Sequence, residues 1–125
     1  MKTILVDAWN TFVKNNTIDS DIYKILESYE NQKIILTNAN DKELINLGIV
    51  NMPYKVFSLS HNPNKDDKLY FIKLIEKYNL IISDLVYIEH NKEAVKSAIS
   101  LGIKTYHYKP QESTDELSQF LLKNL

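Results

Sequence analysis

The strongest constraint on the fold of this chain is the alternation of short apolar runs with longer amphipathic stretches. Five runs have the nearly continuous apolar character of strands that are buried on both faces. They are Thr3 to Val6, Lys33 to Leu36, Val56 to Leu59, Leu85 to Ile88 and Lys104 to His107. Such alternation is typical of a parallel sheet with helices on both sides. The sequence therefore predicts a three-layer, doubly wound α/β fold with a five-stranded parallel sheet.

The stretches between these runs have the spacing of helices with one apolar face. Apolar residues recur at positions i, i+3, i+4 and i+7 in two of them, at Ile22, Ile25, Leu26 and Tyr29 and again at Phe71, Leu74, Ile75 and Tyr78. Both segments are expected to pack on the sheet.

Several residues mark where helices begin and end. Two pairs have the spacing of a helix cap and its partner three residues later, Asn40 with Glu43 and Ser113 with Glu116. The only two glycines, Gly48 and Gly102, stand where left-handed helix ends are expected. Asn91 is expected to cap the helix that follows it.

Length and charge limit the classes of function. The 125 residues suffice for one compact core, so we expect a single domain over residues 1–125. A net charge of -1 gives no field that would attract nucleic acid or an acidic membrane surface. The chain has no cysteine, and its first apolar run is too short for a signal peptide. We therefore expect a cytoplasmic protein.

Ligands of doubly wound sheets bind beyond the carboxyl ends of the strands. The polar residues that follow the predicted strands are Asp7, Thr37, Ser60 and Glu89. These positions are the first candidates for a functional site.

Four segments around these positions resemble, in order, the four motifs of the haloacid dehalogenase (HAD) superfamily. Residues 4–11 resemble the first motif, an apolar strand ending in Asp-x-Asp-x-Thr, and residues 34–39 resemble the second. Lys65, ahead of a helix, resembles the third, and residues 86–91 resemble the fourth, in which two acids follow the strand. The resemblance covers residues 2–108 and implies a HAD-type fold.

The resemblance also implies a chemistry. Asp7 would be a carboxylate nucleophile that attacks a phosphoryl group, and Lys65 would bridge the nucleophile and the phosphate. Thr37 and Asn38 would hold the phosphate, and Thr11 would belong to the same substrate site. A nucleophile and a substrate of like charge need such neutralisation, which explains these residue types.

Magnesium is the cofactor that the resemblance implies, with Asp7, Glu89 and the backbone carbonyl of Trp9 as ligands. Two departures from the family motifs weaken the expectation of magnesium-dependent chemistry. Trp9 stands where the family has an acid that protonates the leaving oxygen, and an indole cannot do so. His90 replaces the second acid of the fourth motif, so we expect weak magnesium binding.

An aromatic residue two positions after the nucleophile also resembles the L-2-haloacid dehalogenase branch, which uses no metal. That chemistry relies on an arginine and on an inserted cap domain. Every basic residue here other than histidine is lysine, and the chain has no room for a cap. The site should therefore be open and suit a phosphorylated group on a large partner. Trp9 would either plug the site or stack on an aromatic group of the substrate.

Three hypotheses follow. The first is a HAD-like phosphohydrolase or phosphotransferase that forms an aspartyl-phosphate on Asp7. The alternative is a catalytically inactive HAD-like domain that serves as a binding or interaction module. A haloacid dehalogenase-like hydrolase is a distant third.

Overall fold

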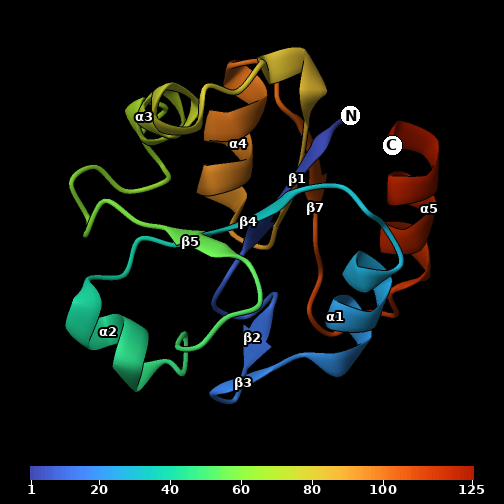
Figure 1. Cartoon of the computed structure of the whole chain (residues 1–125), viewed down its shortest axis with the longest axis horizontal. Coiled ribbons are helices and arrows are strands. Elements are labelled where there is room, and N and C mark those ends of the chain that lie inside the picture. The colour runs from blue at the N-terminus through green and yellow to red at the C-terminus, as the bar shows by residue number, and fades with distance from the viewer.

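The computed structural model describes all residues, 1–125, and its main feature is a parallel sheet (Figure 1). The sheet has the strand order β5-β4-β1-β6-β7. Its strands are β1 (Thr3–Asp7), β4 (Lys33–Leu36), β5 (Lys55–Phe57), β6 (Leu85–Glu89) and β7 (Lys104–His107). All neighbouring pairs are parallel, which confirms the predicted five-stranded sheet. β1 and β6 each end one residue later than predicted, and β5 begins one residue before and ends two residues before the predicted run.

Helices cover both faces of this sheet (Figure 1). They are α1 (Ser20–Glu27), α2 (Asp41–Asn46), α3 (Leu69–Tyr78), α4 (Lys92–Ser100) and α5 (Asp115–Asn124), with a short 3₁₀ helix, η1 (Ile82–Asp84). Buried residues of α1 and α5 belong to one apolar cluster, and those of α3 and α4 belong mainly to a second. None of these helices combines the length and apolarity needed to span a membrane.

The central strand shows why the predicted runs are apolar throughout. In β1, Ile4 and Val6 join the cluster beneath α1 and α5, whereas Leu5 joins the cluster beneath α3 and α4. All three are fully buried. Burying such a side chain contributes about 1.5–3 kcal/mol relative to leaving it exposed. Both layers of helices are thus held on the sheet by successive residues of one strand.

A short hairpin follows β1 and connects it to α1. It consists of β2 (Val13–Lys14) and β3 (Thr17–Ile18), which pair antiparallel. The two residues between them, Asn15 and Asn16, have φ of 52° and 61°. Positive φ at both positions gives the turn whose twist suits a hairpin, and asparagine tolerates it well.

Most of the predicted helix boundaries are confirmed. Asn40 and Glu43 form a reciprocal capping box at α2, and Asn91 accepts hydrogen bonds from the backbone N–H groups of the first turn of α4. Gly48 and Gly102 have φ of 76° and 90°.

The predicted cap of the last helix is wrong. Thr114, not Ser113, precedes the first turn of α5, and its side chain makes no capping hydrogen bond. The first helical residue is Asp115, so Ser113 lies one residue before the cap position, which is Thr114 with φ -85° and ψ 6°. The Ser113 hydroxyl accepts only a long contact of 3.4 Å from the N–H of Asp115.

No cap domain covers the sheet. The segment between β1 and β4 contains only the hairpin and α1, and the segment between β4 and β5 contains only α2. No inserted domain therefore stands over the carboxyl ends of β1, β4 and β6.

Candidate functional site

A cavity of about 340 Å³ lies at the carboxyl ends of the central strands. It is lined by residues that follow β1, β4 and β6 and by residues of the loop ahead of α3. Asp7, Thr37, Lys65 and Glu89, which are separated by 24 to 30 positions in the sequence, all line it. The predicted convergence of these four residues at one edge of the sheet is present in the structure.

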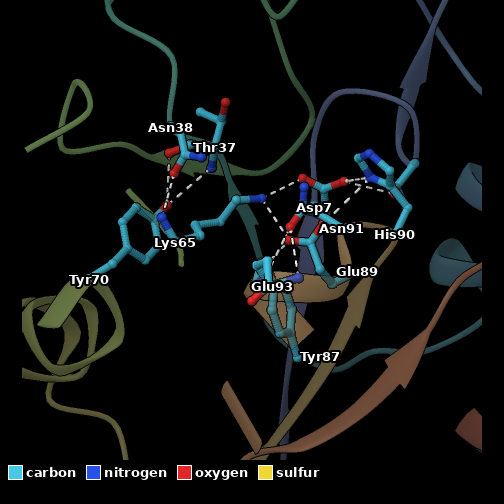
Figure 2. A network of polar contacts seen from close by, with 12 residues as sticks. Asp7, Thr37, Asn38, Lys65, Tyr70, Tyr87, Glu89, His90, Asn91 and Glu93 are labelled. Carbon is cyan, nitrogen blue, oxygen red and sulfur yellow. Dashed lines mark hydrogen bonds and ion pairs between the residues drawn. The ribbon is translucent and has the colours of Figure 1, made fainter. Parts of the chain in front are cut away.

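Lys65 links two buried carboxylates (Figure 2). Its Nζ donates to Oδ1 of Asp7 at 2.5 Å and to Oε1 of Glu89 at 2.7 Å. The exposed fractions are 3% for Asp7, 5% for Lys65 and 0% for Glu89. These ion pairs are therefore shielded from solvent, where screening would weaken them.

The second oxygen of Asp7 is held by two further donors. Thr11 donates its hydroxyl proton to Oδ2 at 2.8 Å, and Nδ1 of His90 lies 2.5 Å from the same oxygen. Nδ1 also lies 3.3 Å from the Thr11 hydroxyl oxygen. Because the threonine donates to Asp7, we infer that Nδ1 carries a proton and also donates to Asp7.

Glu89 is equally well satisfied. Its Oε1 accepts from the hydroxyl group of Tyr87 as well as from Lys65, and its Oε2 accepts from the backbone N–H of Asn91 at 2.9 Å. Each of the four carboxylate oxygens of Asp7 and Glu89 thus has a hydrogen-bond donor. Such saturation is what allows charged groups to be buried.

The two carboxylates have opposite pKa shifts. Burial alone would raise the pKa of Asp7, but the Lys65 ammonium and the hydrogen bond from His90 hold it below the ordinary value. Burial and the nearby charge of Asp7 raise the pKa of Glu89, and Lys65 only partly opposes them. The lowered pKa of Asp7 favours its ionised form.

The two cationic side chains also respond to these carboxylates. Burial would lower the pKa of Lys65, but the charges of Asp7 and Glu89 raise it overall. Burial would likewise lower the pKa of His90, and its contacts with Asp7 raise it instead. Both side chains are thus favoured in their protonated forms.

Neighbouring residues fix the loops that carry the site. The backbone N–H of Lys65 donates to Oδ1 of Asn38 at 2.7 Å, which ties the loop ahead of α3 to the loop after β4. The Tyr70 hydroxyl contacts the backbone N–H of Thr37 at 3.1 Å and donates towards the carbonyls of Thr37 and Phe57 at 2.9 Å (Figure 2). Thr37 is therefore positioned by hydrogen bonds with a buried tyrosine, and Asn38 is positioned by its hydrogen bond with Lys65.

Only some of the remaining predicted site residues line the cavity. Thr37, Asn38 and Trp9 line the cavity, and Trp9 is 52% exposed. Thr11 is fully buried and does not line the cavity, so the expected contact with substrate is replaced by its hydrogen bond to Asp7. Ser60 does not line the cavity, because β5 ends earlier than predicted.

Sequence reasoning missed the main contact of His90. Its ring meets the Trp9 indole edge to face, with centroids 5.7 Å apart, while its Nδ1 reaches Asp7. The position of His90 directly after Glu89 in the fourth motif was the available signal. His61, which contacts Glu43 at 2.6 Å on the rim, had no signal in the sequence.

The donor set does not fit magnesium well. Asp7, Glu89 and His90 offer ligand atoms within 4.8 Å of one another, but this set has only two carboxylates and an imidazole. Magnesium prefers six oxygen ligands at about 2.0–2.1 Å and has little affinity for imidazole. Both oxygens of Asp7 are, moreover, already held by Lys65 and His90.

Comparison with solved structures gives a consistent picture of the fold. A predicted HAD-like family hydrolase from Porphyromonas gingivalis is 12% identical, with a TM-score of 0.73 over 100% of this chain and 99% of that chain. The core domain of a putative phosphoglycolate phosphatase from Streptococcus pneumoniae is 15% identical, with a TM-score of 0.62 over 97% and 95%. The chain has a HAD-like fold.

A third HAD-like structure contains ligands. It is a mutant HAD family enzyme from Bacteroides thetaiotaomicron in complex with magnesium and inorganic phosphate. It is 14% identical, with a TM-score of 0.65, over 94% of this chain and 98% of that chain. No family model and no curated protein matches the sequence. The HAD-like fold is therefore established by structure alone.

Proposed function

We propose that this chain is a HAD-like phosphohydrolase or phosphotransferase that works through an aspartyl-phosphate on Asp7. The observation that carries the proposal is the contact of the Asp7 carboxylate with the Lys65 ammonium, at 2.5 Å, on the wall of an open cavity. The contact keeps a carboxylate charged while bringing a positive group to the place where a phosphate must approach it.

The cavity also offers donors for the phosphate oxygens. The backbone N–H groups of Trp9 and Asn38 donate to no acceptor within the protein, and both residues line the cavity. Backbone N–H groups in such loops are common ligands of phosphate. Lys65, Trp9 and Asn38 would thus surround the anion.

The reaction has two steps. A carboxylate oxygen of Asp7 forms a bond to phosphorus, the bond from phosphorus to the leaving oxygen breaks, and that oxygen takes a proton from solvent water. An acceptor, water or an alcohol, then attacks phosphorus, loses its proton to solvent water and releases Asp7 as the carboxylate. Trp9 cannot protonate the leaving oxygen, so good leaving groups, such as phenolates, should be preferred over alkoxides.

Several properties remain part of this proposal. Magnesium accompanies phosphate in a structural neighbour, but in this chain we propose weak binding, and no step above passes through the metal. The open cavity suits a phosphorylated group on a large partner, with no role for nucleic acid or membrane. A cytoplasmic location stays a prediction from the sequence.

The test is hydrolysis of a panel of aryl and alkyl phosphates, each with and without added magnesium. We expect aryl phosphates to be hydrolysed faster, and Asp7→Asn to abolish turnover. Asp21→Asn, an exposed position on α1, is the matched control and should retain full activity. Activity that survives Asp7→Asn would remove the proposal.

The second candidate is a binding module that holds a phosphorylated ligand without turnover. It is favoured by Trp9 at the position of the expected acid and by the full occupation of both Asp7 oxygens. Under this candidate, wild-type protein binds phosphate but hydrolyses nothing. Trp9→Asp should then create turnover, since general acid–base catalysis is worth about 10²–10⁴ in rate. A Trp9→Asp variant as inactive as the wild type would show that the missing acid is not what limits the site.

A further inference from the structure

We propose that this site accepts a phosphate-type anion without magnesium, because Lys65 and His90 occupy the Asp7 oxygens that a cation would need. The inference rests on the phosphate site proposed above. It goes beyond that site because it assigns to His90 the contact with Asp7 that a metal ion would otherwise make. It also predicts that the site does not require magnesium.

The contacts of Asp7 carry the argument. Oδ1 lies 2.5 Å from Nζ of Lys65, and Oδ2 lies 2.5 Å from Nδ1 of His90. A magnesium ion would have to approach one of these oxygens to about 2.0–2.1 Å. It would displace a charge-assisted hydrogen bond in doing so, and such bonds are about twice as strong as neutral ones.

His90 is held in place on several sides. Nε2 of His107 donates towards the backbone carbonyl of His90 at 3.0 Å, and the imidazole packs edge to face on Trp9. The Thr11 hydroxyl lies 3.3 Å from Nδ1. The imidazole is therefore held in position by its neighbours, so a cation could not easily displace it.

The remaining donors suit an anion. With Nδ1 of His90 on Asp7, its Nε2 has no hydrogen-bond partner in the protein. The unpaired backbone N–H groups of Trp9 and Asn38 line the same cavity, as does Lys65. One imidazole nitrogen, two backbone N–H groups and one ammonium are enough to satisfy a phosphate without a metal ion.

The experiment measures inorganic phosphate binding by isothermal titration calorimetry, first in a chelator and then in excess magnesium. For the wild type we expect dissociation constants within about threefold of each other in the two conditions. Two variants of the same residue sharpen the test. His90→Asp adds a carboxylate beside Glu89, so its phosphate affinity should rise at least about tenfold on adding magnesium. His90→Asn removes the imidazole without adding a carboxylate and should weaken phosphate binding in both conditions.

Each outcome has a clear meaning. Wild-type binding that requires magnesium, manganese or zinc would overturn the inference. So would a His90→Asp variant that is as indifferent to magnesium as the wild type, provided that circular dichroism shows it folded. Binding of phosphate in neither condition would overturn both the inference and the proposed phosphate site. Metal-independent binding without hydrolysis of any phosphoester would support the inference and remove the hydrolase.

Discussion

At the level of single residues, the site depends on contacts between buried carboxylates and positively charged side chains. Asp7 and Glu89 are almost inaccessible to solvent, and the desolvation of an ionised carboxylate costs several kcal/mol. Lys65 and His90 offset that cost by direct contact. The same contacts hold the pKa of Asp7 below its ordinary value, so the groups that stabilise the buried carboxylate also favour its ionised form.

His90 should make the stability of the fold depend on pH. Its pKa in the folded protein is raised by Asp7 above the ordinary value of about 6.5. A raised pKa contributes stability that is fully present below the unfolded value and is lost as the pH rises through the folded value. The free energy of unfolding, measured with urea, should therefore fall as the pH rises from about 6 upwards.

Two histidine variants separate the sources of this pH dependence. His90→Gln should flatten it. His61 also has a raised pKa, because of Glu43, but that pair is exposed and contributes little. His61→Gln should therefore leave most of the slope, and an unchanged slope in His90→Gln would contradict the assignment.

A variant of Tyr70 tests whether its hydroxyl group stabilises the loop after β4. Tyr70→Phe would leave the buried backbone carbonyl of Thr37 without its partner, whereas the N–H of Thr37 and the carbonyl of Phe57 would still bond to each other. We expect a loss of about 1–3 kcal/mol in the free energy of unfolding, together with weaker phosphate binding. Tyr78→Phe, on the same helix, is the matched control and should cost less than about 0.5 kcal/mol. Equal losses in the two variants would refute a specific role for the Tyr70 hydroxyl.

At the scale of elements, the hairpin and α2 are joined where their backbones come close. Gly48, after α2, has φ 76°, and a Cβ added there would lie 2.5 Å from the backbone oxygen of Asn16. The side chain of Asn16 also donates to the carbonyl of Asn46 at 3.3 Å. The glycine thus allows α2 to end against the turn of the hairpin.

A pair of glycine variants tests this close approach. Gly102→Ala suffers only the unfavourable φ of 90°, because its nearest neighbour would be a flexible side-chain atom of Ile82 at 3.7 Å. It should cost about 1–2 kcal/mol. Gly48→Ala should cost clearly more, since the backbone of the hairpin must move. Urea denaturation of both variants decides the matter, and a smaller loss for Gly48→Ala would be inconsistent with this packing.

Elements with a strong hydrophobic period were predictable from the sequence, and elements defined by loops were not. β4 and β7 both have the predicted bounds, but only β4 is an apolar run that is buried throughout, whereas β7 is an edge strand with no buried residue. The short hairpin has no apolar alternation of its own, so its strands could not be placed from the sequence. The end of β5 was misplaced because Ser58 and Leu59 continue the pattern, although Ser58 turns to donate to the carbonyl of Ala39.

At the scale of the whole molecule, the order of the strands creates the site. β1 lies between β4 and β6, so Asp7 meets Glu89 and the loop after β4 at one edge. The rule that ligands bind beyond the carboxyl ends of strands was enough to predict this meeting. The contact of His90 with Asp7 was not predicted, because the position of His90 after Glu89 does not by itself specify the side-chain rotation that brings Nδ1 to Asp7.

The reactivity of the Asp7 carboxylate can be tested by crystallography. Crystals soaked with a phosphate-mimicking fluoride complex, with and without magnesium, would reveal where such a group binds. We predict density bonded to a carboxylate oxygen of Asp7 and contacted by Lys65. Density elsewhere in the cavity, or a carboxylate that remains unmodified in both conditions, would contradict this prediction.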